Sequence, residues 1–249
     1  MYVLLPPSET KHPGGTGRPL DLKTLGFPGL NPVRRKVVAA ARALSADLPA
    51  ARTALKVSAR MDHEITSNTL VTTGPTMPAL ARYTGVLYTA LDTPKLTAAE
   101  RGRASGRILI TSAMFGLVAA GDLIPTYRLS AGSKLPGLPT MAALWRPAMT
   151  EALAALDGPV LDLRSGAYAA FAPAPGALQV RVVTVTRGGE TKPVSHDNKA
   201  IKGVLARLIG TTRAEVDDLP ALLRVTYRAG LTLKRTGPAS LDLIAPPVH

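Results

Sequence analysis

The sequence predicts a mixed α/β (α+β) fold: a single domain with a central sheet flanked by helices. Short apolar segments typical of buried strands recur from the first residues, at 2–5, to the last, at 241–244. Helical patterns stand between these segments. Neither an internal repeat nor a linker long enough to divide the 249 residues occurs. We therefore expect one domain over residues 1–249.

In the first half, prolines and caps mark the ends of the elements. The Pro6-Pro7 pair ends the first strand because proline donates no ladder hydrogen bond. Asn31-Pro32 supplies a cap and a first-turn proline, and Thr97 with Glu100 forms a capping box. We expect a strand at 2–5, a loop at 8–19, helices at 31–44, 49–56, 59–69 and 79–91, a helix opened by the capping box, and a strand at 107–112.

In the second half, glycines and caps again mark the boundaries. Pro147 must kink or split the helix that contains it, because its ring clashes with the preceding turn. Gly188-Gly189 is typical of a hairpin turn. We expect an irregular segment at 114–132, a helix at 140–156, a strand at 159–163, a hairpin of 178–186 with 191–194, a helix through Lys199 to Gly210, a short helix capped by Thr212 and Glu215, and edge strands at 231–234 and 241–244.

The chain is strongly basic throughout. Thirty Lys and Arg against 17 Asp and Glu give a net charge of +13, of which residues 1–125 carry +7 and residues 126–249 carry +6. An even excess of this size favours a folded surface that meets a polyanion, the alternative being an arginine-rich proteome without a specific partner. Ten aromatic residues are few for single-strand recognition by base stacking. Contact with a duplex backbone needs only cations and N–H donors.

Several function classes are excluded by composition. The chain has no cysteine, so disulfides, thiolate metal sites and cysteine nucleophiles are absent. The four histidines lack metal-ligand spacing, and no Walker A, G-x-S-x-G or G-x-G-x-x-G signature follows a strand. We expect neither a metal nor a cofactor. Without a signal peptide or a long apolar run, we expect a cytoplasmic protein with no membrane partner.

Residues 194–203, V-S-H-D-N-K-A-I-K-G, predict a strand end that turns into a helix. Ser195 or Asp197 can cap this helix, and Lys199 and Lys202 lie in its first turns. Cations there oppose the helix dipole unless an anion comes to meet them. Together with Asn198, which shares a face with Lys202, these groups indicate an anion site, with phosphate the obvious candidate.

Three more segments place polar groups where strands end. They contain Lys11, Arg128 and the Arg164-Ser165 pair, the last followed by a glycine that permits a tight turn. Strand ends that face one crevice are where ligands usually bind in α/β proteins. These segments and the 194–203 segment therefore predict a positively charged cleft.

A structural alternative remains open for the two arginines. Arg164 can pair with Asp162, and Arg128 with Asp122, as ordinary ion pairs.

Residues 49–69 predict a second kind of site. Two short helices joined at Leu55–Ser58 carry Lys56 in the turn and Arg60 just after it, which resembles a helix-hairpin-helix element that contacts DNA phosphates. The turn lacks the glycine that such hairpins favour. An ordinary pair of packing helices is at least as well supported.

Five motifs together resemble the YaaA family of bacterial peroxide-stress resistance proteins. They occur in the family's order and cover nearly the whole chain. They are V-L-L-P-P-S-E near the start, Y-T-G-V-L-Y at 83–88, G-D-L-I-P-T-Y-R-L-S-A-G at 121–132, L-D-L-R-S-G-A-Y at 161–168 and V-S-H-D-N-K-A-I-K-G at 194–203.

The resemblance implies a single mixed α/β domain of unusual topology with a basic cleft and a helix-hairpin-helix-like element at about 49–69. It also implies a role in peroxide stress, control of free iron, and binding of duplex or branched DNA. The family's cleft residues correspond to Lys11, Arg128, Arg164, Lys199 and Lys202.

This chain departs from the family at two places. Ala119-Ala120 stands where the family has Arg-Pro, and Thr10 where it has glycine. The loss of a cleft arginine would weaken phosphate binding or mark a change of ligand.

Two functions follow as alternatives. The first is a protein that binds duplex or branched DNA through backbone phosphates in the basic cleft, without sequence readout. The second is an enzyme that acts on a small anionic or nucleobase-like metabolite in the same cleft, with Lys11, Tyr168, His196 and Lys199 in acid-base or nucleophilic roles. The sequence decides neither between them nor on the oligomeric state.

Overall fold

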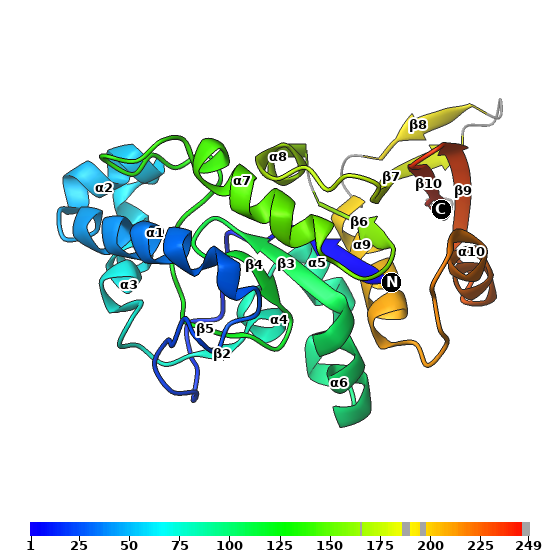
Figure 1. Cartoon of the computed structure of the whole chain (residues 1–249), viewed down its shortest axis with the longest axis horizontal. Helices are drawn as coiled ribbons and strands as arrows, with labels where there is room; N and C mark the ends of the chain where they lie inside the picture. Colours follow the sequence, from blue (N-terminus) through cyan, green and yellow to red (C-terminus); the bar gives the residue numbers. More distant parts are fainter. Residues whose placement is uncertain (165, 186–189, 195–197, 246–249) are drawn as a thin grey trace.

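A mixed sheet forms the centre of the protein (Figure 1). The computed structural model describes residues 1–164, 166–185, 190–194 and 198–245. Within these residues the sheet order is β4-β3-β1-β6-β7-β10-β9, and β8 pairs with the far part of β7. The strands of this sheet are β1 (Tyr2–Leu5), β3 (Ile108–Ser112), β4 (Gly116–Ala119), β6 (Val160–Asp162), β7 (Leu178–Val185), β8 (Thr191–Pro193), β9 (Thr232–Gly237) and β10 (Ser240–Ile244). Two further strands, β2 (Met77–Pro78) and β5 (Leu123–Ile124), pair separately.

The middle of the sheet is parallel and both ends are antiparallel. Strand β1 runs parallel to β3 on one side and to β6 on the other, and β7 runs parallel to β6 and β10. Strands β4, β8 and β9 are each antiparallel to their neighbours. Because parallel strands end at the same edge, the segments that follow β1, β3 and β6 meet there.

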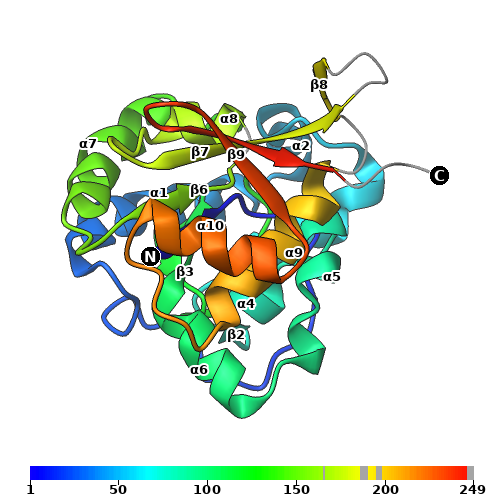
Figure 2. The same cartoon turned by 90° about the vertical axis from the view of Figure 1, so that its right-hand side faces the viewer.

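Helices cover both faces of the strands, and Figure 2 shows α7 and α9 on opposite sides. Helix α9 packs on β1 and β7 and against α5, α6 and α10, whereas α7 contacts β4 and α8. The helices are α1 (Asn31–Leu44), α2 (Leu48–Leu55), α3 (Asp62–Ser67), α4 (Ala79–Arg82), α5 (Val86–Leu91), α6 (Ala98–Arg107), α7 (Met141–Ala154), α8 (Gly166–Phe171), α9 (Asn198–Thr211) and α10 (Leu219–Arg228). Short 3-10 turns stand at Pro28–Leu30, Ala59–Met61, Asn68–Leu70 and Thr93–Lys95.

Two buried arginines connect the sheet to the loops. The guanidinium of Arg34 donates to the carbonyls of Phe115 and Leu117, at 2.9 and 2.7 Å, and to that of Gly26 at 2.8 Å. Arg82 donates in the same way to carbonyls of the 12–14 loop and of Ile124. Burial lowers the pKa of each arginine to about 10. Both remain cations near neutral pH, and their guanidinium groups bond carbonyls inside the protein.

The predicted fold class is confirmed, and so are most elements. The strands at 2–5, 107–112 and 159–163, the helix at 31–44 and the capping box at Thr97 occur with small shifts of boundary. The strands of the 178–186 and 191–194 hairpin pair as expected, although its Gly188-Gly189 turn lies outside the described residues. Pro147 lies inside one continuous helix, α7, and does not split it.

The 114–132 segment is mostly irregular, as expected, apart from β4 and β5. Three expectations about elements are wrong. The predicted 79–91 helix is divided into α4 and α5, because Gly85 has a φ of 98° that no helix accommodates. No helix begins at Thr212. The next helix is α10, and the Asp218 side chain caps it by accepting from the Ala221 N–H at 2.6 Å. Of the two predicted edge strands, β10 is interior and β9 lies at the edge.

Candidate functional site

A pocket lies where β1 and β6 end, and we call it the strand-end pocket. Residues 6–10 after β1, residues 84–88 at the start of α5, Leu163 and Tyr168 after β6, and the first turns of α9 line it. Its volume is about 610 Å³. This size and this place at the carboxyl ends of parallel strands are typical of small-molecule sites in α/β proteins.

Two glycines allow the walls of this pocket to meet. A Cβ on Gly85 would lie 2.9 Å from the Ser8 Oγ, and a Cβ on Gly203 would lie only 2.2 Å from the Leu87 carbonyl oxygen. Helix α5 therefore lies directly against both the loop after β1 and helix α9. Side chains at either glycine would separate these walls.

Helix α9 contributes two lysines to the pocket in different environments. Lys199 is exposed, whereas Lys202 is about nine-tenths buried. The Lys202 Nζ donates to the Leu163 carbonyl at 3.2 Å and, at the outer limit of a hydrogen bond, to the Arg164 carbonyl at 3.5 Å. Burial lowers the pKa of Lys202, and the nearby charge of Asp162 partly offsets that effect. Asn198, one turn earlier, also lines the pocket.

Arg164 is a structural residue in this fold. Its guanidinium donates to both Asp162 carboxylate oxygens, at 3.0 and 2.7 Å, and both side chains are fully buried. Its remaining nitrogen donates to the carbonyls of Tyr168 in α8 and of Ala172 just after it. The predicted Arg164–Asp162 pair is confirmed. Arg164 therefore fixes the segment that leads into α8, and its guanidinium is already fully paired.

Arg128 is also paired, although not with Asp122. Its guanidinium donates to Glu64 of α3 at 2.9 Å and to Glu9 at 3.1 Å. Asn68 holds its backbone by accepting from its N–H and donating to its carbonyl. The expected Arg128–Asp122 pair is wrong because Asp122 instead accepts from backbone N–H groups.

Lys11 lies behind the loop that lines the strand-end pocket. Its Nζ donates to the carbonyls of Ser8 and Glu9, each at 3.1 Å, and lies 4.2 Å from the centroid of the Tyr127 ring. Burial and, to a lesser extent, the charge of Arg128 lower the pKa of Lys11 to about 7. Lys11 therefore holds the loop whose residues line the pocket, and is not itself among the lining residues.

The remaining polar groups of the pocket are hydroxyls and one carboxylate. Ser8 and Thr10 share a hydrogen bond at 3.2 Å, and the Glu9 side chain is largely exposed beside them. Burial raises the pKa of the Tyr168 hydroxyl above its usual value. Tyr168 therefore contributes a neutral, half-buried aromatic face to the pocket.

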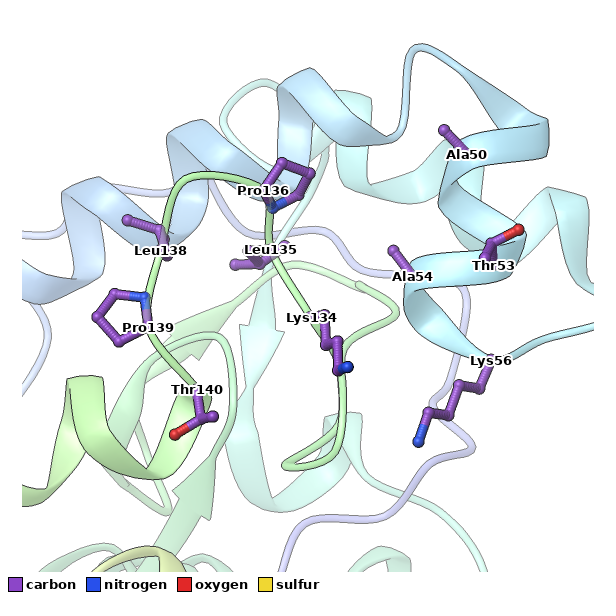
Figure 3. Close-up of a pocket in the computed structure, with 10 residues that line it drawn as sticks. All are labelled: Ala50, Thr53, Ala54, Lys56, Lys134, Leu135, Pro136, Leu138, Pro139 and Thr140. Atoms are coloured by element: carbon purple, nitrogen blue, oxygen red, sulfur yellow. The ribbon is translucent and has the colours of Figure 1, made fainter.

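A second pocket lies beside the predicted hairpin, and we call it the hairpin pocket (Figure 3). Helix α2 and the 134–140 loop line it, and its volume is about 700 Å³. Alanine, leucine and proline side chains make up most of its walls. In Figure 3 the side chains of Lys56, from the end of the helix, and Lys134, from the loop, both extend into the gap between helix and loop.

The hairpin itself is held by an ion pair and by one unusual backbone conformation. Arg52 of α2 pairs with Asp62 of α3 through two hydrogen bonds. Lys56 ends α2 with a φ of 56°, in the left-handed region. Arg60 is exposed in the 3-10 turn that follows. Two packed helical segments are thus present at 48–55 and 59–70, close to the predicted ranges.

The structure brings together only some of the residues predicted for one basic cleft. Lys199, Lys202, Asn198 and Tyr168 line the strand-end pocket. Lys56 lines the separate hairpin pocket, and Arg60 is exposed in the 3-10 turn that follows α2. Ser165, Ser195 and His196 lie outside the described residues.

The expectation of one positively charged cleft is not confirmed. Arg164 and Arg128 are neutralised by carboxylates, and the carboxylate of Glu9 also lines the strand-end pocket. Residue types and strand ends predicted the cations correctly. They did not reveal that carboxylates distant in sequence, such as Glu64, would pair with them.

Two residues of these sites were missed by the sequence analysis. Lys134 lies in a loop without a motif, and only its backbone bond to the Ala54 carbonyl, at 3.1 Å, brings it beside α2. Thr84 belongs to a segment that was predicted to be the interior of a helix. The Gly85 that follows it is the one signal that could have indicated a loop there.

Within the described part of the chain, no three His, Asp or Glu side chains gather closely enough to hold a metal ion. None of the helices described has both the length and the apolar character that crossing a bilayer requires.

The fold and the strand-end pocket define a mixed α/β protein with a ligand-sized, lysine-containing site at the carboxyl ends of its parallel strands. Comparison with known proteins identifies its family. The model of the peroxide stress protein YaaA family matches residues 1–233, and the chain belongs to this family. The resemblance inferred from the five motifs is thereby confirmed.

Full-length relatives carry only a family name. A UPF0246 protein of Corynebacterium efficiens is 47% identical over 240 residues, which cover 94% of this chain and 95% of the relative. A UPF0246 protein of Corynebacterium glutamicum is 42% identical with the same coverage. One from Streptomyces coelicolor is 41% identical over the full length of both chains.

Proposed function

We propose that this peroxide stress family protein binds duplex or branched DNA through backbone phosphates, without reading its sequence. The observation that carries the proposal is that Lys56 of the α2 end and Lys134 of the facing loop both line the hairpin pocket, with Arg60 exposed four residues after Lys56. Within the described part of the chain, none of these three cations pairs with a carboxylate. They stand on a chain of net charge +13. Phosphate contacts require cations of this kind and no particular base edge.

The salt dependence of binding tests the proposal. With Lys56, Arg60, Lys134 and one further cation on phosphates, affinity for a 20-base-pair duplex falls about a hundredfold between 50 and 200 mM salt. Fluorescence anisotropy with two duplexes of unrelated sequence measures it. We expect the same curve for both. Affinity that is unchanged by salt, or that differs tenfold between the duplexes, would contradict backbone binding.

A single substitution separates DNA binding from folding. Lys56→Gly removes a cation at the hairpin but relieves the left-handed backbone conformation, which costs a non-glycine residue on the order of 1 kcal/mol. The variant should therefore be at least as stable to urea as the parent protein and bind duplex DNA several-fold more weakly. Lys234→Ala, on the distant edge strand β9, is the matched control and should leave binding nearly unchanged. Equal losses in the two variants would refute the hairpin as the contact.

A second function is favoured by the strand-end pocket itself. An enzyme that acts on a small anionic metabolite needs an enclosed space with cations and an aromatic wall, and Lys199, Lys202 and Tyr168 supply both. Lys11, with its pKa near 7, stands one loop away from a substrate there. Metabolite turnover that Lys199→Ala abolishes, with DNA affinity unchanged, would support this function.

A further inference from the structure

The strand-end pocket has two chemically different sides. Lys199 and Lys202 project from α9, whereas the loop after β1 and the start of α5 present Glu9 and the hydroxyls of Ser8 and Thr84. A simple anion would gain from the lysines but would be repelled by Glu9. A ligand with an anionic end and a hydroxyl-bearing part matches both sides.

Lys202 retains capacity to bind such an anionic end. An ammonium group has three N–H donors. Lys202 uses one on the Leu163 carbonyl at 3.2 Å and a second, weakly, on the Arg164 carbonyl at 3.5 Å. Its Nζ is buried with Asp162 as the nearby acidic group, and Asp162 is already bonded to Arg164 and to the Gln179 side chain. A phosphate would supply the charge partner that Lys202 otherwise lacks.

The opposite side suits a sugar. Glu9 lies between Ser8 and Thr10, whose hydroxyls share a hydrogen bond, and the guanidinium of Arg128 donates to its carboxylate at 3.1 Å and holds it in place. A carboxylate held in this way binds the paired hydroxyls of a ribose ring. The aliphatic hydroxyls of Ser8, Thr10 and Thr84 can each donate or accept a hydrogen bond.

The middle of the pocket is apolar and partly aromatic. Pro6, Pro7 and Leu87 stand in its walls together with the neutral ring of Tyr168. A volume of about 610 Å³ also exceeds what a sugar phosphate fills. The remaining space suits a flat ring that packs against Tyr168.

We propose that the strand-end pocket binds a free nucleoside 5′-monophosphate, with the phosphate on Lys199 and Lys202, the ribose on Glu9 and the base against Tyr168. This proposal deepens the second candidate function and is independent of DNA binding at the hairpin. It concerns binding alone.

Calorimetric titration of the whole protein with AMP, GMP, adenosine, ribose 5-phosphate and inorganic phosphate tests the proposal. We expect AMP or GMP to bind at least tenfold more tightly than any of the three fragments. Equal affinity for inorganic phosphate would reduce the site to a phosphate site and overturn the proposal. So would the absence of binding by all nucleotides at millimolar concentration. Tighter binding of a 5′-phosphorylated oligonucleotide than of AMP would show that the occupant is a DNA end and also overturn it.

Two substitutions give opposite signatures. Lys202→Met keeps the length of the buried side chain, removes its charge and should weaken nucleotide binding at least tenfold, with Lys95→Met as the exposed control. Glu9→Gln should weaken the binding of AMP, because it removes the acceptor for the ribose hydroxyls. It should leave the affinity for inorganic phosphate unchanged or raise it, because it also removes a repulsive charge. Weakening of both ligands by Glu9→Gln would contradict the ribose assignment. If Lys202→Met fails to fold, Glu9→Gln and Lys199→Met at the exposed positions carry the test.

The DNA measurement distinguishes this proposal from the first proposed function. AMP should leave duplex affinity unchanged, and Lys56→Gly should leave AMP affinity unchanged. If the parent protein binds duplex DNA but binds no nucleotide, the pocket proposal alone is refuted.

Discussion

At the scale of single residues, burial decides which cations are free to act. Arg164 was a candidate anion ligand by sequence, yet Asp162 lies two residues before it and takes its guanidinium in a fully buried pair. Burial by itself raises the pKa of Asp162, and the hydrogen bonds and charge of Arg164 more than offset it, so that the pKa lies below the usual value. Asp162 therefore stabilises the fold above its unfolded pKa, and this contribution is lost as pH falls through its folded pKa.

Replacement of Arg164 should lower the free energy of unfolding more than replacement of an exposed cation does. Arg164→Met leaves a buried carboxylate without a partner and should lower the free energy of unfolding at pH 7 by about 3–5 kcal/mol. Urea denaturation measures the loss. Lys95→Met breaks an exposed ion pair with Asp92 and should cost less than about 1 kcal/mol. The loss in free energy of unfolding caused by Arg164→Met should become smaller as pH falls and Asp162 takes up a proton. A loss that is small at pH 7 or independent of pH would contradict the structural role of Arg164.

Lys11 makes a separate prediction about pH. Its folded pKa of about 7 lies below the ordinary value of 10.5, so the unfolded chain holds a proton that the folded chain has released between these values. The free energy of unfolding should therefore rise as pH increases from about 7 toward 10. Lys11→Met should flatten this part of the stability profile. Observation of the Lys11 Nζ by NMR should show a midpoint near pH 7. A midpoint above pH 9.5 would refute the assigned burial effect.

At the scale of elements, close packing of α5 on α9 positions the strand-end pocket. Gly203→Ala should destabilise the protein by about 1–3 kcal/mol, because the added methyl group collides with the Leu87 carbonyl. Gly102→Ala in α6 is the control, since its Cβ would meet open space and alanine favours a helix by up to about 1 kcal/mol. Urea denaturation of the two variants should give changes of opposite sign. A neutral Gly203→Ala would show that the two helices are free to separate.

Local signals predicted most elements because they act within a few residues. Proline pairs, the Thr97 capping box and apolar runs fixed the first strands and helices. The errors have a common physical origin. At Gly85 and after Thr212, a tertiary contact or a later cap overrode the local pattern. The candidate cations were found by residue type, whereas their pairing with Glu9 and Glu64 depended on folding that no local pattern encodes.

At the scale of the whole molecule, the cations of this chain of net charge +13 fall into three groups by their contacts. Arg34 and Arg82 hold loops through carbonyls, and Arg128 and Arg164 pair with carboxylates. The exposed cations remain for partners. This division explains why an even excess of charge does not create one basic cleft. It also favours the hairpin, at the end of the molecule opposite α10 in Figure 1, as the place for a polyanion.

The central claim is that DNA binds at the hairpin and not to the net charge. The most direct measurement compares two variants that each lose three positive charges. The first variant changes the hairpin and its facing loop and combines Lys56→Ala, Arg60→Ala and Lys134→Ala. The second changes exposed positions near α10 and combines Arg213→Ala, Arg228→Ala and Lys234→Ala. In anisotropy titrations, the first variant should lose at least tenfold more duplex affinity than the second and show a salt slope reduced by about three. Equal losses in the two variants would contradict the account.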